Sequence, residues 1–174
     1  MGGEGIGFNP AEQFHYEPVT ASPQSGVEFS HDQTVFKPFL PNLEAEKQLK
    51  VLQAINQAGV QSVVKVVGVS DNGYWMEKID GVPLSDYYKQ QGKVPEGFYD
   101  SLTTAVNELH NAGFAHGDLT PGNIIIENEA GRVRLIDPAS YDLSNSKTIA
   151  KFQQGDLEQI SRGLPKQLKI WARF

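Results

Sequence analysis

Short apolar runs separated by turn-forming residues follow a glycine-rich start of the chain. Runs rich in β-branched or aromatic residues between Ser, Pro, Gly or Asp are typical of strands. Three strands are predicted on this ground, at residues 14–20, 27–30 and 34–39. Residues 1–13 contain four glycines, all within the first seven positions, and are expected to form a flexible N-terminal segment.

The period of the apolar pattern then changes from strand-like to helical. Leu43, Leu49, Leu52 and Ile55 recur at near-helical spacing, which predicts a helix that opens at Pro41–Asn42 and ends at Gly59.

A hairpin is predicted after this helix. Residues 63–69 and 74–79 flank Asp71-Asn72-Gly73, and an Asn-Gly pair favours a tight turn because it supplies positive φ at low cost. Residues 14–80 are therefore expected to form an antiparallel sheet with one helix packed on it.

Gly81-Val82-Pro83 marks the expected boundary to a second, mainly helical part, residues 81–174. A helix is predicted from Pro95 to Gly113, because Pro favours a helix start and Gly a helix end. The other elements expected here are strands at 123–127 and 133–136, then one or two short helices from Ser144 onward.

Composition narrows the class of protein. The 174 residues are 39% hydrophobic, enough for one domain or two small lobes with a packed core. The net charge of −6 disfavours binding to nucleic acid or to anionic membranes, since both carry phosphates. There are no cysteines, no apolar run long enough to span a membrane and no Sec-type start. A soluble monomer is expected.

The candidate chemistry lies in His116-Gly117-Asp118-Leu119-Thr120-Pro121-Gly122-Asn123 and in Asp137, which follows two apolar residues. Phosphoryl transfer needs a carboxylate to orient the attacking hydroxyl and oxygen ligands for Mg²⁺. A hairpin between Asn123 and Asp137 brings both side chains near Asp118. The alternative is that Asp118 and Asn123 only form turns.

This pattern of His-x-Asp, Asn five residues later and a distant apolar-apolar-Asp resembles the catalytic core of the protein-kinase-like superfamily. The resemblance implies an α+β, reduced bilobal kinase fold, with an antiparallel N-lobe and a truncated, mainly helical C-lobe. It implies ATP and Mg²⁺ as cofactors, Asp118 as catalytic base, and Asn123 and Asp137 as metal ligands. His116 is expected to be a buried structural residue.

Two departures from the family pattern bear on regulation. Gly117 replaces the arginine that reads a phosphorylated activation loop, so control by such phosphorylation is not expected. Asp137-Pro138-Ala139 replaces Asp-Phe-Gly, and the proline is expected to hold Asp137 in extended geometry.

Lys37 lies in the third predicted strand, where the resemblance places the lysine that holds the α- and β-phosphates. A solvated strand lysine is the alternative. Its partner is expected to be a glutamate on the following helix, with Glu46 preferred to Glu44, although both also suit the helix dipole.

The resemblance places adenine against Met76-Glu77-Lys78-Ile79, with Met76 as gatekeeper and the backbones of Glu77 and Ile79 as partners of the base. A plain core methionine is the alternative. The phosphate-covering loop is expected at residues 21–26, with Gly26 as its glycine, in preference to the glycines of residues 3–7.

Only 37 residues follow Asp137. This organisation resembles the compact effector kinases that type III secretion systems inject into host cytoplasm. The resemblance implies a Ser/Thr kinase acting on a host protein, with the ninety-kilodalton heat-shock chaperone or the ubiquitin-conjugating machinery as candidate partners. Asp156 is predicted either to brace the catalytic loop or to be only a helix cap or a surface charge.

Three other hypotheses remain open. His-Gly-Asp-Leu with Ile-Asp-Pro-Ala is similar to aminoglycoside and fructosamine kinases, which act on small molecules. His-Gly-Asp-Leu-Thr is shared with the compact Bud-type atypical kinases of tRNA modification. A pseudokinase that binds nucleotide without turnover is the alternative from outside the enzymes.

Overall fold

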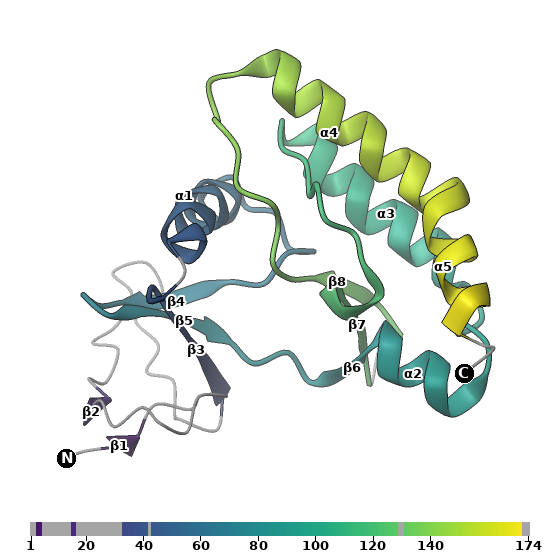
Figure 1. Cartoon of the computed structure of the whole chain (residues 1–174), viewed down its shortest axis with the longest axis horizontal. Coiled ribbons are helices and arrows are strands. Elements are labelled where there is room, and N and C mark those ends of the chain that lie inside the picture. The colour runs from purple at the N-terminus through teal and green to yellow at the C-terminus, as the bar shows by residue number, and fades with distance from the viewer. Residues whose placement is uncertain (1–2, 5–14, 17–32, 42, 129–130, 172–174) are drawn as a thin grey trace.

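The computed structural model describes residues 3–4, 15–16, 33–41, 43–128 and 131–171. Two of its strands, β1 (Gly3–Glu4) and β2 (His15–Tyr16), pair antiparallel with each other. The strand predicted at 27–30 lies outside the described residues, as does Gly26. Figure 1 shows the remaining elements as two groups, with a small sheet between them.

The first group is a three-stranded antiparallel sheet with β5 (Gly73–Glu77) between β3 (Thr34–Pro38) and β4 (Val66–Val69). The hairpin predicted between β4 and β5 is present, but Gly73 does not have the positive φ expected of it. Its role is steric, because a Cβ at this position would lie 2.3 Å from the carbonyl oxygen of Lys37 on the neighbouring strand.

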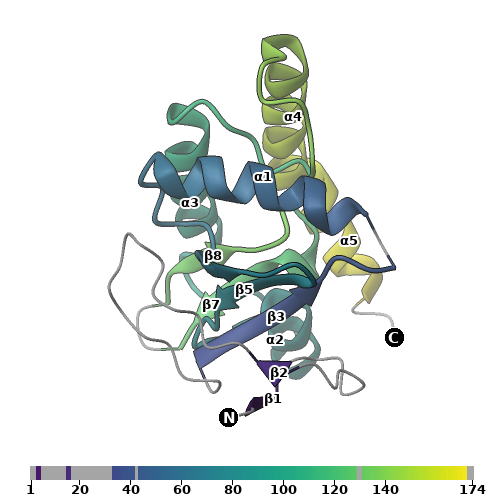
Figure 2. The ribbon, with the colours of Figure 1, turned by 90° about the vertical axis from the view of Figure 1, so that its left-hand side faces the viewer.

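Helix α1 (Glu44–Gln57) crosses one face of this sheet (Figure 2). Leu49, Leu52 and Ile55 are buried as their spacing predicts, whereas Leu43 precedes the helix and is 62% exposed. The helix ends close to Gly59, where φ is +79°. The amide of Asn56 ties it to the sheet by donating to the Val64 carbonyl oxygen and accepting from the Val66 N–H.

The expected boundary at residues 81–83 is itself a strand. β6 (Gly81–Pro83) pairs with β7 (Ile124–Glu127), which pairs with β8 (Val133–Leu135), and all neighbours are antiparallel. A short 3-10 turn, η2 (Pro121–Asn123), leads into β7. The hairpin of β7 and β8 thus carries the chain from Asn123 back to Asp137, as predicted.

Helices form the second group. α2 (Leu84–Gln91) was not predicted, and α3 (Phe98–Asn111) corresponds to the helix expected before Gly113. The last part of the chain is nearly continuous helix, with α4 (Ser146–Glu158), the π-helical turn η3 (Gln159–Gly163) and α5 (Leu164–Trp171). None of the helices in the described part of the chain is both long and apolar enough to cross a bilayer.

A single apolar core joins the two groups. It includes Leu52 of α1, Met76 of β5, Val106 of α3, Leu135 of β8 and Leu168 of α5. The backbone also crosses between them, because the Leu135 N–H donates to the Ser62 carbonyl oxygen and the Val64 N–H to the Leu135 carbonyl oxygen. The sheet and the helices therefore hold a fixed relation around the strands that carry the candidate site.

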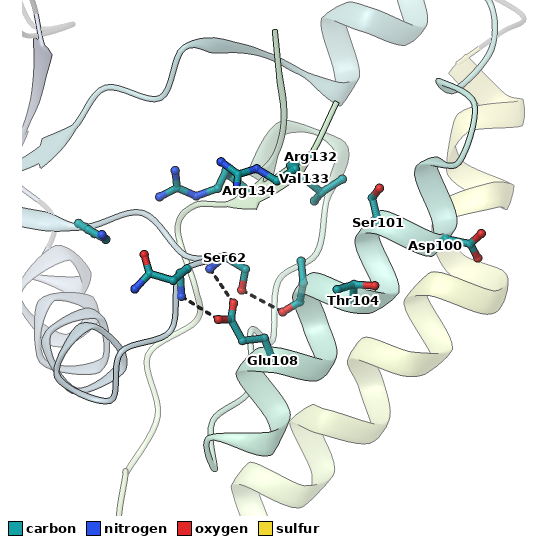
Figure 3. A pocket seen from close by; sticks show the side chains of 11 residues that line it. Ser62, Asp100, Ser101, Thr104, Glu108, Arg132, Val133 and Arg134 are labelled. Carbon is teal, nitrogen blue, oxygen red and sulfur yellow. Dashed lines mark hydrogen bonds between the residues drawn. The ribbon is translucent and has the colours of Figure 1, made fainter. Parts of the chain in front are cut away.

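A cavity of about 580 Å³ lies where these groups meet, between residues 61–65, α3 and β8 (Figure 3). None of the predicted site residues that the structure describes lines it. At one wall the Glu108 carboxylate accepts from the N–H groups of Gln61 (3.1 Å) and Ser62 (2.8 Å), while the Ser62 hydroxyl donates to the Ala105 carbonyl oxygen. Glu108 therefore anchors the loop that follows α1 to helix α3.

Burial alone would raise the pKa of Glu108, but the hydrogen bonds from Gln61 and Ser62 and the nearby charge of Arg134 lower it below its ordinary value. A carboxylate with a lowered folded-state pKa contributes stability above its unfolded pKa, and that stability is lost as the pH falls through the folded pKa.

We predict that Glu108→Gln lowers the free energy of unfolding at pH 7 by on the order of 1 kcal/mol, since the site is partly solvated. The difference from wild type should shrink from about pH 5 to about pH 3, where the wild-type carboxyl also becomes neutral. Urea unfolding over this range measures it, with the exposed Glu96→Gln as control. A difference that stays constant down to pH 3 contradicts the anchoring role.

Candidate active site

The catalytic-loop candidate, residues 115–119, is held by an unusually complete set of backbone hydrogen bonds. Asp156 of α4 is only 2% exposed, and its two carboxylate oxygens accept from the N–H groups of His116 and Gly117, each at 2.8 Å. The His110 Nε2 lies 2.8 Å from the same carboxylate and links it to α3. Asp156 therefore braces the catalytic loop, which is one of the roles predicted for it.

Two further side chains that sequence reasoning missed hold the same loop. The Tyr141 hydroxyl accepts from the Ala115 N–H and donates to the Ala115 carbonyl oxygen, both at 2.9 Å. Gln159, in the π-helical turn, donates to the Leu119 carbonyl oxygen at 2.9 Å. Neither residue belongs to a sequence motif, and both act only because α4 and η3 pack against the loop.

His116 is fully buried, as predicted. Burial lowers its pKa, so the ring is neutral near pH 7. Its Nδ1 accepts from the Asp118 N–H at 3.1 Å, so Nε2 carries the proton and donates to the Ile136 carbonyl oxygen at 2.7 Å. The ring thus links the backbone of Asp118 to that of Ile136, the residue before Asp137.

Asp118 and Asn123 meet at the start of β7. The Asn123 side-chain nitrogen donates to the Asp118 carbonyl oxygen (2.9 Å) and to the Asp118 Oδ2 (3.1 Å). Asp118 is exposed, so an acceptor hydroxyl can approach its carboxylate. Both hydrogen bonds use the side-chain nitrogen of Asn123, so within the described part of the chain its side-chain oxygen remains free to bind another group.

Asp137 is brought to the same place by β8. The Ile136 N–H donates to the Asn123 carbonyl oxygen at 3.0 Å, and the Ala139 N–H to the His116 carbonyl oxygen at 2.7 Å. Between these two bonds Asp137 has a φ of +50°, so the extended geometry predicted from Pro138 is wrong. Bonds on both sides of the residue impose the left-handed conformation, which is a strain typical of functional sites.

Lys37 reaches this group from the first sheet. Its Nζ lies 2.9 Å from the Asp137 Oδ1, an ion pair between residues 100 positions apart. The prediction that Lys37 faces the reaction centre is consistent with this contact, and the alternative of a solvated strand lysine is not.

The predicted partner of Lys37 is wrong. Gln48, and not Glu46, accepts from the Lys37 Nζ, at 2.6 Å. Residues two apart in sequence point to different sides of a helix. Glu46 is therefore exposed to solvent, whereas Gln48 faces β3. Glu44 is engaged elsewhere, because it accepts from the Ser140 hydroxyl.

The predicted adenine segment lies at the end of β5. Met76 is 8% exposed and belongs to the core, which is consistent with both interpretations of this residue. The Glu77 N–H already donates to the Lys65 carbonyl oxygen, and its carboxylate pairs with Arg134. The Ile79 N–H makes no backbone hydrogen bond within the described residues.

The donor set fits a magnesium ion completed by its substrate. Asn123 offers a side-chain oxygen and Asp137 a carboxylate oxygen, which are ligands that Mg²⁺ accepts. No cluster of three His, Cys, Asp or Glu side chains suited to a metal occurs in the described part of the chain. An ion held by these two residues would therefore take its remaining ligands from phosphate and water, as Mg²⁺ does in phosphotransferases.

The RIO domain family matches residues 13–170. The chain belongs to the RIO domain family. Sperm motility kinase 1 of Mus musculus is 32% identical to this RIO domain over 95 residues, 52% of the chain and 19% of that protein. The probable serine/threonine-protein kinase HSL1 of Saccharomyces cerevisiae is 25% identical over 107 residues, 58% of the chain and 7% of that protein. The chain thus spans less than a fifth of these relatives.

Among solved structures, that of Rad53 in complex with AMP-PNP matches with a TM-score of 0.50 and 20% sequence identity, covering 72% of this chain and 37% of that chain. This confirms the predicted reduced protein-kinase-like fold for the RIO domain.

Gly117 lies at the centre of the loop, with a φ of +81°. A Cβ here would lie 2.8 Å from the Ala139 Cβ, so the place that the family pattern gives to arginine has no room even for alanine. Gly59 has nearly the same φ, +79°, but nothing within 4 Å of its Cβ position. Both positions have the left-handed backbone, but only Gly117 has the close contact. Comparing substitutions at the two glycines therefore separates the energetic cost of the backbone conformation from that of the steric contact.

We predict that Gly59→Ala lowers the free energy of unfolding by about 1–2 kcal/mol, the cost of the left-handed conformation, and leaves nucleotide binding unchanged. Gly117→Ala should cost more and should also weaken nucleotide binding, since Ala139 and Asp137 must shift. Thermal unfolding and nucleotide titration of both variants measure this. Equal effects of the two substitutions would show that the contact with Ala139 is unimportant.

Proposed function

We propose that this RIO domain is an ATP- and Mg²⁺-dependent protein kinase that transfers the γ-phosphate to a serine or threonine hydroxyl. The observation that carries the proposal is the meeting of Lys37, Asp137, Asn123 and Asp118 from the two halves of the fold. Similarity to a protein kinase named for serine and threonine, and to a structure solved with AMP-PNP, supports both the acceptor and the nucleotide.

Each residue has a distinct task in this reaction. Asp118, exposed and fixed by Asn123, orients the acceptor hydroxyl and takes its proton as the oxygen attacks the γ-phosphorus. Lys37 holds the phosphates with its ammonium group. Asn123 and Asp137 would hold Mg²⁺, which neutralises the charge of the triphosphate when it is bound. The backbone of Ile79 offers a donor to adenine.

The narrower expectations stay predictions. These are delivery into host cytoplasm by a type III system, and a host acceptor such as the ninety-kilodalton heat-shock chaperone or the ubiquitin-conjugating machinery. Membership of the RIO domain family supports a kinase-like domain without pointing to secretion. A protein acceptor is favoured over a small molecule because one curated relative is named as a probable serine/threonine-protein kinase.

We predict that γ-labelled ATP with Mg²⁺ labels a discrete protein band in eukaryotic lysate when wild type is added. Asp118→Asn should reduce the label by about 100-fold or more, the scale of general base catalysis. Asp71→Asn, the same change in an exposed turn, should behave as wild type.

Three other outcomes of this labelling experiment would each contradict part of the proposal. Undiminished labelling by Asp118→Asn contradicts the role of Asp118. Label confined to small molecules would make the domain a small-molecule kinase. ATP binding without transfer to any acceptor, in this lysate and in a bacterial one, would make it a nucleotide-binding pseudokinase.

A further inference from the structure

The partners of Lys37 differ in charge. Its ammonium lies 2.6 Å from the neutral Gln48 amide oxygen and 2.9 Å from the Asp137 carboxylate. Within the described residues, Asp137 is the only acidic side chain paired with Lys37, and Lys37 is the only basic side chain paired with Asp137. Gln48 therefore fixes the direction of the lysine without offsetting its charge.

The ion pair is partly accessible to solvent. The side chains of Lys37 and Asp137 are 23% and 37% exposed, so neither is sealed in the core. A divalent cation approaching the Asp137 carboxylate meets an ammonium already bound to Oδ1. The ammonium and the metal ion are both positively charged and repel each other. The lysine therefore lowers the affinity of Asp137 for a free metal ion.

A glutamate at position 48 would change this balance. Its carboxylate would compete with Asp137 for the ammonium, because it would carry a full opposite charge that the neutral Gln48 amide lacks. The partly buried position of Gln48 on α1, facing β3, would place that carboxylate against Lys37. The neutral residue found here leaves the lysine with Asp137.

We propose that Gln48 is a positioning residue that keeps Lys37 on Asp137, so that Lys37 screens the metal ligand until nucleotide phosphates draw the ammonium away. The inference rests on the proposed function in taking Asp137 as a metal ligand. It adds that the metal enters with the nucleotide and binds weakly without it. Lys37 is thus a reversible partner of Asp137, and Gln48 sets how firmly the lysine stays there.

The test is a titration of the full chain with Mn²⁺ alone, without nucleotide, followed by electron paramagnetic resonance of the free ion. Lys37→Met should strengthen Mn²⁺ binding by roughly two- to fivefold, the scale of a partly exposed ion pair. Gln48→Glu should also strengthen it, by drawing Lys37 from Asp137. Asp137→Asn should abolish the gain in both.

Two controls separate this mechanism from a simple increase in negative charge. Gln53→Glu adds the same charge at an exposed position of α1 and should have little effect on Mn²⁺ binding. In the Lys37→Met background, Gln48→Glu should add no more than Gln53→Glu does, because the lysine through which it acts is absent. Thermal unfolding of each variant confirms that it is folded.

Three results would overturn the inference. These are unchanged Mn²⁺ affinity in Lys37→Met, unchanged affinity in Gln48→Glu, or a gain in Gln48→Glu that persists undiminished without Lys37. The titration involves no phosphoryl transfer, so its outcome stands apart from the proposed kinase activity. A domain that fails to transfer phosphate but shows this metal response would contradict only the proposed function.

Discussion

The buried carboxylate of Asp156 is the constraint on which the reaction centre depends. Three donors converge on it, from His116, Gly117 and His110, so one side chain of α4 fixes both the catalytic loop and helix α3. Its removal would leave the buried His116 N–H and the partly buried Gly117 N–H without their partner, which is more costly than the loss of an exposed ion pair. Helix α4 is thus part of the site through this one carboxylate.

From this fixed loop the geometry propagates through hydrogen bonds to the strands. His116 binds the Ile136 carbonyl oxygen and Asn123 the Ile136 N–H, so the position of Asp137 follows from that of the loop. The Leu135 backbone in turn binds residues 62–64, which lead into the sheet that carries Lys37. Backbone hydrogen bonds therefore place the segments that carry Lys37, Asp118, Asn123 and Asp137, and the Asn123–Asp118 and Lys37–Asp137 side-chain contacts complete the arrangement.

The sequence was most informative where residue chemistry and spacing coincide. Asp118, Asn123 and Asp137 could be predicted as a group, and so could the hairpin that brings them together. Gln48 could not, because the expected partner was a glutamate, and which residue of α1 faces Lys37 depends on the rotation of the helix about its axis. Helix α2 was missed because Leu84 is its only buried residue. Tyr141 and Gln159 act through tertiary contacts that no local pattern contains.

The most direct test of the account is a crystal structure of the domain with Mg²⁺ and a non-hydrolysable ATP analogue. The account predicts a metal ion bound by the side-chain oxygens of Asn123 and Asp137, Lys37 moved from Asp137 to the phosphates, and adenine against Ile79. Nucleotide bound away from these residues, or a metal ion that contacts neither Asn123 nor Asp137, would contradict it.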